Sequence, residues 1–386
     1  MHIGLNAISF VPGTFGGMET YFRNLLAQLQ GLDRENNYTV LCDKRFAGEF
    51  PLFNEAFRIE NINYAKPSFK WFLRGVLRNT LDIDILTRKM NGLDVDIVHH
   101  PFTVLTPPDI KLPSVLTFWD MQQEFFPEFF TRVELAKRKR LYKSSAEAAR
   151  RIIVSARFTK DCLVERYGID GDKIEVIYTG YGPEYRVIED PGHLAEVRRK
   201  YALDKPFFFY PAATWPHKNH KALLAALKIM VDRYSFDGEL VLTGIAMQSH
   251  GDFLAEINRL GLDGVVKVLG YLPAAELPCL YNLARMLVFP SLFEGFGIPL
   301  VEAMACGCPV VCSDVTSLPE VVDDAGELFD PREPEQIAEK IWTVWTGDEK
   351  RREMRSKGLA RSRQFSWEET ARRTMEVYRK VGGGTA

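Results

Sequence analysis

The sequence predicts an α/β protein with two Rossmann-like, doubly wound parallel-sheet domains that face each other across a cleft. Short apolar runs alternate with longer segments of helical period, and this alternation is typical of βαβ units around a parallel sheet. The alternation runs twice along the chain. The length of 386 residues is enough for two domains at roughly 150 residues each, and each can bury its own core.

The individual elements follow from these runs. In the first half, strands are expected at 2–8, 38–43, 96–102, 113–120 and 150–156, with helices at 18–30 and 132–151. In the second half, strands are expected at 206–213, 238–244, 265–270, 285–291 and 308–314, with helices at 219–234, 251–261, 274–284 and 299–307. After residue 331 the chain is expected to be helical as far as Val381.

Glycine, proline and charged residues cluster at 178–193, where the first series of runs ends. We therefore predict a domain boundary at about residue 185, with an N-terminal domain at 1–185 and a C-terminal domain at 186–365. Residues 366–386 are expected to form a helix that packs back toward the N-terminal domain, followed by a mobile glycine-rich tail.

The composition excludes several classes of function. The formal net charge is −2, which gives no general reason to expect nucleic-acid binding. No His, Cys or acidic cluster has metal-ligand spacing, so no metal site is predicted. Six cysteines lie in apolar stretches and are expected to be buried thiols in a reducing compartment: Cys42, Cys162, Cys279, Cys306, Cys308 and Cys312.

The chain has no run of about 18 apolar residues, and its first residues resemble a strand more than a leader peptide. We expect a cytoplasmic protein. The stretches 69–79 and 131–151 combine basic and aromatic residues, as segments lying on anionic membranes do. A lipid-linked saccharide acceptor at the inner face of the membrane fits both. Ordinary surface helices with solvated charges remain the alternative.

The segment 287–311, LVFPSLFEGFGIPLVEAMACGCPVV, is the most informative part of the sequence. A buried strand ends near Pro290, a loop with Gly295 and Gly297 follows, and a helix is expected from about Pro299. The glycines allow a ligand to approach the backbone amides, and the helix dipole favours an anion there.

Glu294 precedes this helix, and Glu302 is expected in its first turn. Carboxylates accept hydrogen bonds from hydroxyl groups, so two of them around an anion site suit a phosphate flanked by polyols, such as a nucleotide sugar. The alternative is that both acids only favour the helix N-terminus. Lys218 follows another strand in the turn WPHKNH, where it can neutralise a phosphate or remain a solvated surface lysine.

Four segments in this order resemble the retaining glycosyltransferases of family 4, also called group 1 glycosyltransferases, which have the GT-B fold. They are FGGMETYFRNLL at 15–26, PAATWPHKNHKALLAAL at 211–227, EGFGIPLVE at 294–302 and SLPEVVDDAGELFDP at 317–331. The resemblance covers nearly the whole chain. It implies that the N-terminal domain binds the acceptor and that the C-terminal domain binds a nucleotide-sugar donor.

The resemblance also implies roles for single residues. Glu294 would contact the donor sugar, Glu302 the ribose, and Lys218 the diphosphate. Further donor-binding positions would be Gly16, Gly17, Thr214, Tyr271, Leu272, Gly295, Phe296, Gly297 and Ile298. For Gly16 and Gly17 the alternative is a plain turn, and for Tyr271 and Leu272 it is packing. The family mechanism needs no metal and no cofactor other than the donor substrate.

Two positions depart from the pattern of many relatives. Thr214 stands where a basic residue is common, and Trp119 stands where a catalytic-centre histidine is common. Asp120, next to Trp119, is a candidate for orienting an acceptor or sugar hydroxyl, and a helix cap is its alternative. Among the histidines, only His217 beside Lys218 is a candidate for the site.

The resemblance thus implies transfer of a hexosyl group, with retention of configuration, to a hydroxyl acceptor in glycan assembly. Within the family, the WPHKNH turn looks more like that of polysaccharide-assembly mannosyltransferases, so GDP-mannose is the favoured donor, with UDP-glucose or a deoxysugar donor behind it. A catalytically silent nucleotide-sugar-binding partner is the alternative, given Trp119 and Thr214. An NAD-linked dehydrogenase is disfavoured because PGTFGG and TGYGPE both fail the GxGxxG spacing.

Overall fold

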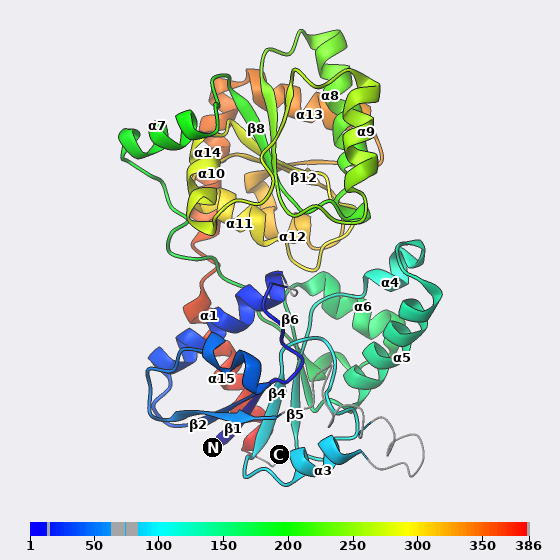
Figure 1. The fold of residues 1–386 in the computed structure, drawn as a ribbon, viewed down its shortest axis with the longest axis vertical. Coiled ribbons are helices and arrows are strands. Elements are labelled where there is room, and N and C mark those ends of the chain that lie inside the picture. The colour runs from blue at the N-terminus through cyan, green and yellow to red at the C-terminus, as the bar shows by residue number, and fades with distance from the viewer. Residues whose placement is uncertain (14–15, 63–73, 75–83, 384–386) are drawn as a thin grey trace. The chain divides into compact units, whose positions relative to one another are not determined.

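The computed structural model describes residues 1–13, 16–62, 74 and 84–383 (Figure 1). The chain divides into two compact units. The N-terminal unit comprises Met1–Thr179 together with Trp367–Ala386, and the C-terminal unit comprises Gly180–Ser366. The first change of unit falls a few residues before the expected boundary at 185, within the Gly- and Pro-rich segment.

In the described residues, the N-terminal unit holds a seven-stranded parallel sheet in the order β3-β2-β1-β4-β5-β6-β7. Its strands are β1 (His2–Ala7), β2 (Asn37–Cys42), β3 (Phe57–Asn61), β4 (Ile97–His100), β5 (Ser114–Phe118), β6 (Arg151–Val154) and β7 (Ile174–Val176). Its helices are α1 (Gly17–Leu32), α3 (Ile85–Asn91), α4 (Gln122–Phe125), α5 (Arg132–Ala148), α6 (Arg157–Tyr167) and α15 (Trp367–Gly382), with short 3₁₀ turns η1 (Lys44–Glu49), η2 (Pro127–Phe129) and η3 (Gly171–Lys173).

The C-terminal unit holds a six-stranded parallel sheet, again counted over the described residues, in the order β10-β9-β8-β11-β12-β13. Its strands are β8 (Phe207–Pro211), β9 (Glu239–Thr243), β10 (Val266–Val268), β11 (Met286–Phe289), β12 (Val310–Ser313) and β13 (Gly326–Phe329). Its helices are α7 (Pro191–Lys200), α8 (His220–Tyr234), α9 (His250–Leu260), α10 (Leu277–Leu283), α11 (Ile298–Ala305), α12 (Leu318–Val322), α13 (Pro334–Thr346) and α14 (Asp348–Ser362), with turns η4 (Pro216–Lys218), η5 (Ala274–Glu276) and η6 (Asp323–Ala325).

Helices cover both faces of the second sheet (Figure 1): α8 packs against α9 and α13, and α11 packs against α10 and α14. The strands between these layers are therefore buried on both sides, as the apolar runs FFFY and MLVF require. The order of strands reverses between β8 and β11. The loops that follow these two neighbouring strands meet at the carboxyl ends of the strands, where open α/β sheets bind ligands.

The predicted parallel sheets of Rossmann type are confirmed, but several elements were missed or misplaced. The strands β3, β7 and β13 lie toward the sheet edges and have partly exposed, mixed sequences, which give no apolar signal. The expected helix 132–151 ends at Ala148, because Ala149 is extended and Arg151 begins β6. All six cysteines are free and buried, as predicted.

The helix α15 belongs to the core of the N-terminal unit, although it follows the C-terminal unit in sequence. It packs against α1 and against β4, β5 and β6. The Tyr378 hydroxyl lies 2.7 Å from His99 Nδ1, and His99 Nε2 lies 2.7 Å from Thr117 Oγ1, all in the interior. Burial lowers the pKa of His99 to about 3, so this histidine is a neutral packing residue.

Replacing Tyr378 by Phe should therefore destabilise the N-terminal unit. The variant leaves one ring nitrogen of His99 buried without a partner, at a cost of about 1–3 kcal/mol. The measurement is a urea titration followed by circular dichroism. The matched control is Tyr271→Phe, at a residue that is 73% exposed, which should leave the curve unchanged. Equal curves for wild type and Tyr378→Phe would show that this contact contributes nothing to stability.

Candidate active site

Lys218 and Glu294 form an ion pair at the carboxyl ends of two central strands of the second sheet, β8 and β11, where the strand order reverses. Lys218 ends the turn η4 after β8, and Glu294 lies in the loop after β11. The Lys218 Nζ lies 2.6 Å from Glu294 Oε1, with the two side chains 17% and 14% exposed. Because β8 and β11 are neighbours in the sheet, residues that are far apart in sequence meet here.

The charges of this pair are set by burial and by each other. Burial alone would raise the pKa of Glu294, but Lys218 and then His217 outweigh it, and the pKa is lowered overall. Burial, assisted by the Lys218 charge, lowers the pKa of His217 to about 4. His217 is therefore neutral near pH 7, and among the described residues Lys218 is the cation that pairs with the ionised Glu294.

The loop that carries Glu294 is fixed by two hydroxyl groups from the segment before α12. Thr316 Oγ1 accepts a hydrogen bond from the Glu294 amide at 3.2 Å. The buried Ser317 Oγ lies 3.1 Å from both the Glu294 and the Phe296 carbonyl oxygens, to which it can donate. Neither hydroxyl was predicted from the sequence, although both lie at or beside the start of the fourth segment that resembles the family.

Gly297 is required where the loop enters α11. It has φ 102°, and a Cβ at this position would lie 2.9 Å from Leu318 Cδ2. The ring of Phe296 is buried 5.8 Å from that of Phe365, which leaves its backbone rather than its side chain for a ligand. Ile298 is the first residue of α11, and Gly295 lies between Glu294 and Phe296 in the same loop.

Glu302 is the fifth residue of α11, so its expected position in the first turn is wrong. The helix begins at Ile298, and the helix dipole at its N-terminus therefore does not explain this acid. Tyr281 donates a hydrogen bond to Glu302 Oε2 at 3.0 Å, and Tyr185 is a second hydrogen-bond partner. Burial raises the pKa of Glu302 to about 7, against the opposing effect of the two hydrogen bonds.

The remaining predicted residues of the C-terminal unit lie on other loops. Tyr271 is exposed and Leu272 is buried; both follow β10, which is two strands away from β8 at the sheet edge. Thr214 is buried after β8, and its Oγ1 accepts a hydrogen bond from the Met247 amide at 2.7 Å. Its hydroxyl oxygen thus holds the loop after β9.

In the N-terminal unit, Gly16 caps α1 with φ 51° and Gly17 is the first residue of that helix. Asp120 follows β5, and its Oδ1 accepts a hydrogen bond from the Gln122 amide at 3.1 Å, although the N-cap residue of α4 is Met121. The Trp119 indole is buried, and its Nε1 donates to the Pro101 carbonyl at 2.7 Å. Trp119 is therefore a packing residue and offers no titratable group.

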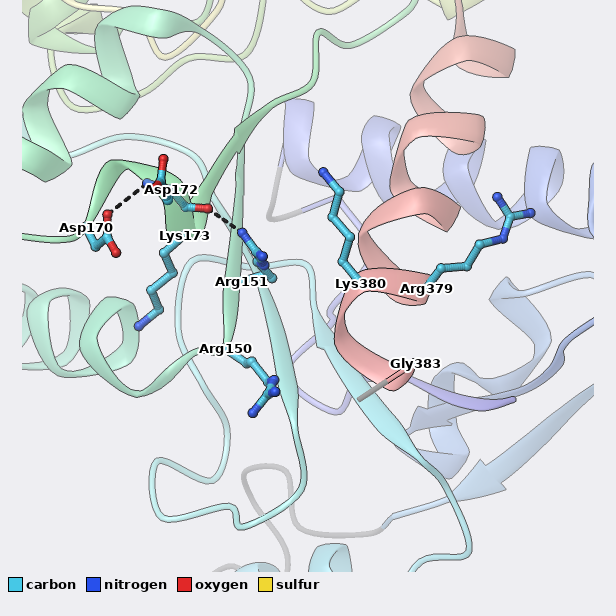
Figure 2. Close-up of a pocket in the computed structure, with 8 residues that line it drawn as sticks. All are labelled: Arg150, Arg151, Asp170, Asp172, Lys173, Arg379, Lys380 and Gly383. Atoms are coloured by element: carbon cyan, nitrogen blue, oxygen red, sulfur yellow. Dashed lines mark hydrogen bonds between the residues drawn. The ribbon is translucent and has the colours of Figure 1, made fainter. Parts of the chain in front are cut away.

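A basic pocket of about 580 Å³ in the N-terminal unit contains none of the predicted site residues (Figure 2). Figure 2 shows its Lys and Arg side chains pointing in different directions. Lys173 donates to the carbonyls of Ala146 and Glu147 at the end of α5, and Lys380 pairs with Glu175. Lys173 and Lys380 thus lie at the C-terminal ends of α5 and α15, where a cation interacts favourably with the negative end of the helix dipole.

Two further observations concern the described residues only. They contain no group of three or more His, Cys, Asp or Glu side chains arranged to hold a metal ion. Among the helices formed by them, none combines the length and the apolar character that a membrane span requires.

This fold and site define an α/β transferase of the GT-B type, and comparisons with known proteins agree. The family model "Glycosyl transferases group 1" matches residues 195–361, and "Glycosyltransferase Family 4" matches residues 15–185. The O-antigen chain mannosyltransferase B of Escherichia coli is 31% identical over 285 residues, which cover 74% of this chain and 74% of that protein. The chain therefore belongs to the family 4, or group 1, glycosyltransferases.

Solved structures show the same fold. Sucrose-phosphate synthase from Thermosynechococcus elongatus aligns over 100% of both chains, with a TM-score of 0.78 and 19% identity. Anabaena HepE in complex with UDP-glucose aligns over 99% of this chain and 100% of that chain, with a TM-score of 0.75 and 19% identity. The predicted family and the GT-B fold are confirmed.

Glu302 should make the stability of the C-terminal unit depend on pH. Between about 4.5, the ordinary pKa, and about 7, the native state holds a proton that the unfolded state has lost, so stability falls as pH rises through this window. Glu302→Gln removes this ionisation. We compare the free energy of unfolding of the variant with that of wild type at each pH. The difference, variant minus wild type, should be larger at pH 8 than at pH 5 by on the order of 2 kcal/mol.

The measurement is urea unfolding at both pH values, with the exposed Glu196→Gln as the matched control. The control should differ from wild type by the same amount at each pH. A pH-independent difference for Glu302→Gln as well would show that the native carboxyl ionises normally.

Proposed function

We propose that this glycosyltransferase moves a mannosyl group from GDP-mannose to a hydroxyl group of a growing glycan, with retention of configuration. The observation that carries the proposal is the largely buried Lys218–Glu294 pair at the point where the strand order reverses. The choice of mannose is supported by the 31% identical relative, which is an O-antigen chain mannosyltransferase.

Lys218 is proposed to neutralise the diphosphate that leaves with the nucleotide. A bound diphosphate would compete with Glu294 for the ammonium group, because both are anions that accept its hydrogen bonds. Glu294 would then be available to accept hydrogen bonds from hydroxyls of the donor sugar. Lys218 would thus exchange one anionic partner for another, while Glu294 would exchange the ammonium group for sugar hydroxyls. Neither the lysine nor the glutamate would be left without a partner.

Glu302 is proposed to bind the ribose hydroxyls, held by its two tyrosine partners. The amides of the Gly295–Ile298 loop are proposed to face the sugar and the diphosphate, since the Phe296 side chain is buried and the two glycines have no side chain. Gly16 and Gly17 would bind the donor phosphates, Asp120 would orient a hydroxyl, and Tyr271 and Leu272 would lie near the base. Lys218 and the backbone amides would provide the positive charge that other transferases take from a metal.

The departing phosphate oxygen can accept the proton of the acceptor hydroxyl, so attack on the same face as the leaving group needs no protein base. This suits a site in which Trp119 offers no titratable group. The same observation favours a second candidate, a catalytically silent nucleotide-sugar-binding partner. The two differ in turnover.

A lipid-linked saccharide at the inner face of the membrane is the proposed acceptor. The helix α5 supports this choice, because its exposed surface carries several cations, among them Lys137, Lys139 and Arg140. The second basic stretch considered from the sequence, 69–79, lies outside the described residues except for Arg74.

Donor binding should depend on Lys218 and Glu302. In calorimetric titrations with GDP-mannose, Lys218→Gln and Glu302→Ala should each weaken binding by about 10- to 100-fold, the loss expected for a charge-assisted hydrogen bond. Lys228→Gln, at an exposed lysine of α8, is the matched control and should bind as wild type does. Wild-type affinity in both site variants, with normal unfolding curves, would refute the donor site.

Turnover should separate the enzyme from the silent partner. Incubation with GDP-mannose and a lipid-linked saccharide should give an α-mannoside, the configuration of the donor, as read from the anomeric signals in NMR. Glu294→Gln should lower the rate by at least about 100-fold because it removes a charge at the reacting sugar. Donor binding without transfer or slow donor hydrolysis would identify the silent partner instead, and a β-mannoside would refute retention.

A further inference from the structure

A second pocket in the C-terminal unit lies beside the proposed donor site and is unused by the proposed chemistry. It has a volume of about 420 Å³, within the range of roughly 300–1,000 Å³ that is usual for small-molecule sites. Its walls come from the turn η4 with the start of α8 on one side, and from the residues around the start of α9 on the other.

The apolar wall of the pocket is Trp215, together with Pro216 and Phe253. The Trp215 side chain is 39% exposed. Within the described part of the chain, its ring makes no ring-to-ring contact with another aromatic side chain, and its indole N–H has no hydrogen-bond partner. Exposed tryptophan surface of this kind, next to polar groups, is typical of binding sites.

The opposite wall is polar. Gln248, Ser249 and Asp252 line it, and Gln248 and Asp252 are exposed. Among the described residues, the Gln248 amide and the Ser249 hydroxyl have no hydrogen-bond partner. Asp252 has one contact, at 3.9 Å from Lys221, and both of these side chains are more than half exposed. The wall thus offers donors and acceptors that are available to a ligand.

Thr214 joins the two walls. Its Oγ1 accepts a hydrogen bond from the Met247 amide at 2.7 Å, and its carbonyl accepts one from the Ser249 amide at 3.0 Å. Its own amide donates to the Ile245 carbonyl at 3.2 Å. The Trp215 backbone is also fixed, since its carbonyl accepts the Lys218 amide at 3.0 Å. The pocket is therefore preformed in the free protein.

We propose that this pocket is a saccharide subsite, which holds a sugar residue of the glycan acceptor or product against Trp215. A pyranose has a face of C–H groups that packs on an indole ring, and its rim of hydroxyls can pair with Gln248, Ser249 and Asp252. A phosphate is disfavoured because the Asp252 carboxylate would repel it, and among the described lining residues Lys221 is the one lysine or arginine that could offset this charge. The identity of the sugar rests on the proposed function.

The turn η4 connects the subsite to the donor site, with Trp215 before it and Lys218 at its end. Glycan held at Trp215 would remain close to the transfer site between reactions. Loss of the subsite should therefore raise KM for long acceptors. The value of kcat, and the KM for a monosaccharide acceptor, should both stay close to those of wild type.

The test uses the full chain, an α-linked mannotriose as the probe and saturation-transfer NMR with calorimetry. Wild type should bind the probe, Trp215→Ala should weaken binding by about tenfold, and Trp215→Phe should recover most of it. Gln248→Ala should also weaken it. Phe53→Ala, at an aromatic residue of the N-terminal unit that is 68% exposed, is the control and should bind as wild type does.

GDP-mannose titrations of the same variants separate this proposal from the proposed function. Unchanged donor affinity in Trp215→Ala, with reduced mannotriose affinity, supports the subsite. Reduced affinity for both would place Trp215 in the donor site and overturn the subsite. Absence of mannotriose binding by a wild type that still binds GDP-mannose would overturn the subsite and leave the proposed function standing.

Discussion

The second sheet is organised around a single constraint, the placing of a lysine and a glutamate at neighbouring strand ends. Lys218 and Glu294 meet because β8 and β11 are adjacent at the reversal of strand order, and the two charges then hold each other in a largely buried position. Leaving either charge there without a partner would be costly. A ligand that separated this pair would have to bring an anion for the lysine and hydrogen-bond donors for the carboxylate, as the proposed nucleotide-sugar donor does.

The surrounding structure keeps that pair in place through hydroxyl groups instead of further charges. Ser317 and Thr316 fix the loop of Glu294, while the buried Tyr210 donates a hydrogen bond to the Lys218 carbonyl at 2.7 Å. Hydrogen bonds from these neutral hydroxyl groups rigidify the loops without adding charge to the site. Thr214 follows the same principle, because its hydroxyl joins two loops and shapes the neighbouring pocket.

The two glutamates of the E-x7-E pattern are equivalent in sequence but not in environment. Glu294 faces a cation, which keeps its pKa low, whereas Glu302 faces two tyrosines, and burial raises its pKa to about 7. One carboxylate is thus ionised in the free protein, and the other is poised to gain or lose a proton near neutral pH. Divergent protonation of two nearby acids commonly accompanies divergent roles.

The sequence by itself determined the class of fold and the family. Short apolar runs such as FFFY and MLVF favour strands buried on both faces, and Gly297 stands where a positive φ favours glycine. The weak edge strands β3, β7 and β13 were not predictable, because their pairing comes from neighbours that are distant in sequence. The start of α11, and with it the turn that Glu302 occupies, was also misjudged.

Only the tertiary structure decided which side chains face one another. Lys218 and Glu294 are both visible in the sequence, but their ion pair depends on strand order, which short-range patterns do not encode. Tyr281 and Tyr185 had no local signal, since burial beside Glu302 is what gives their hydroxyls a role. Local propensity is set by neighbours along the chain, whereas protonation and pairing are set by neighbours in space, and the fold alone supplies those.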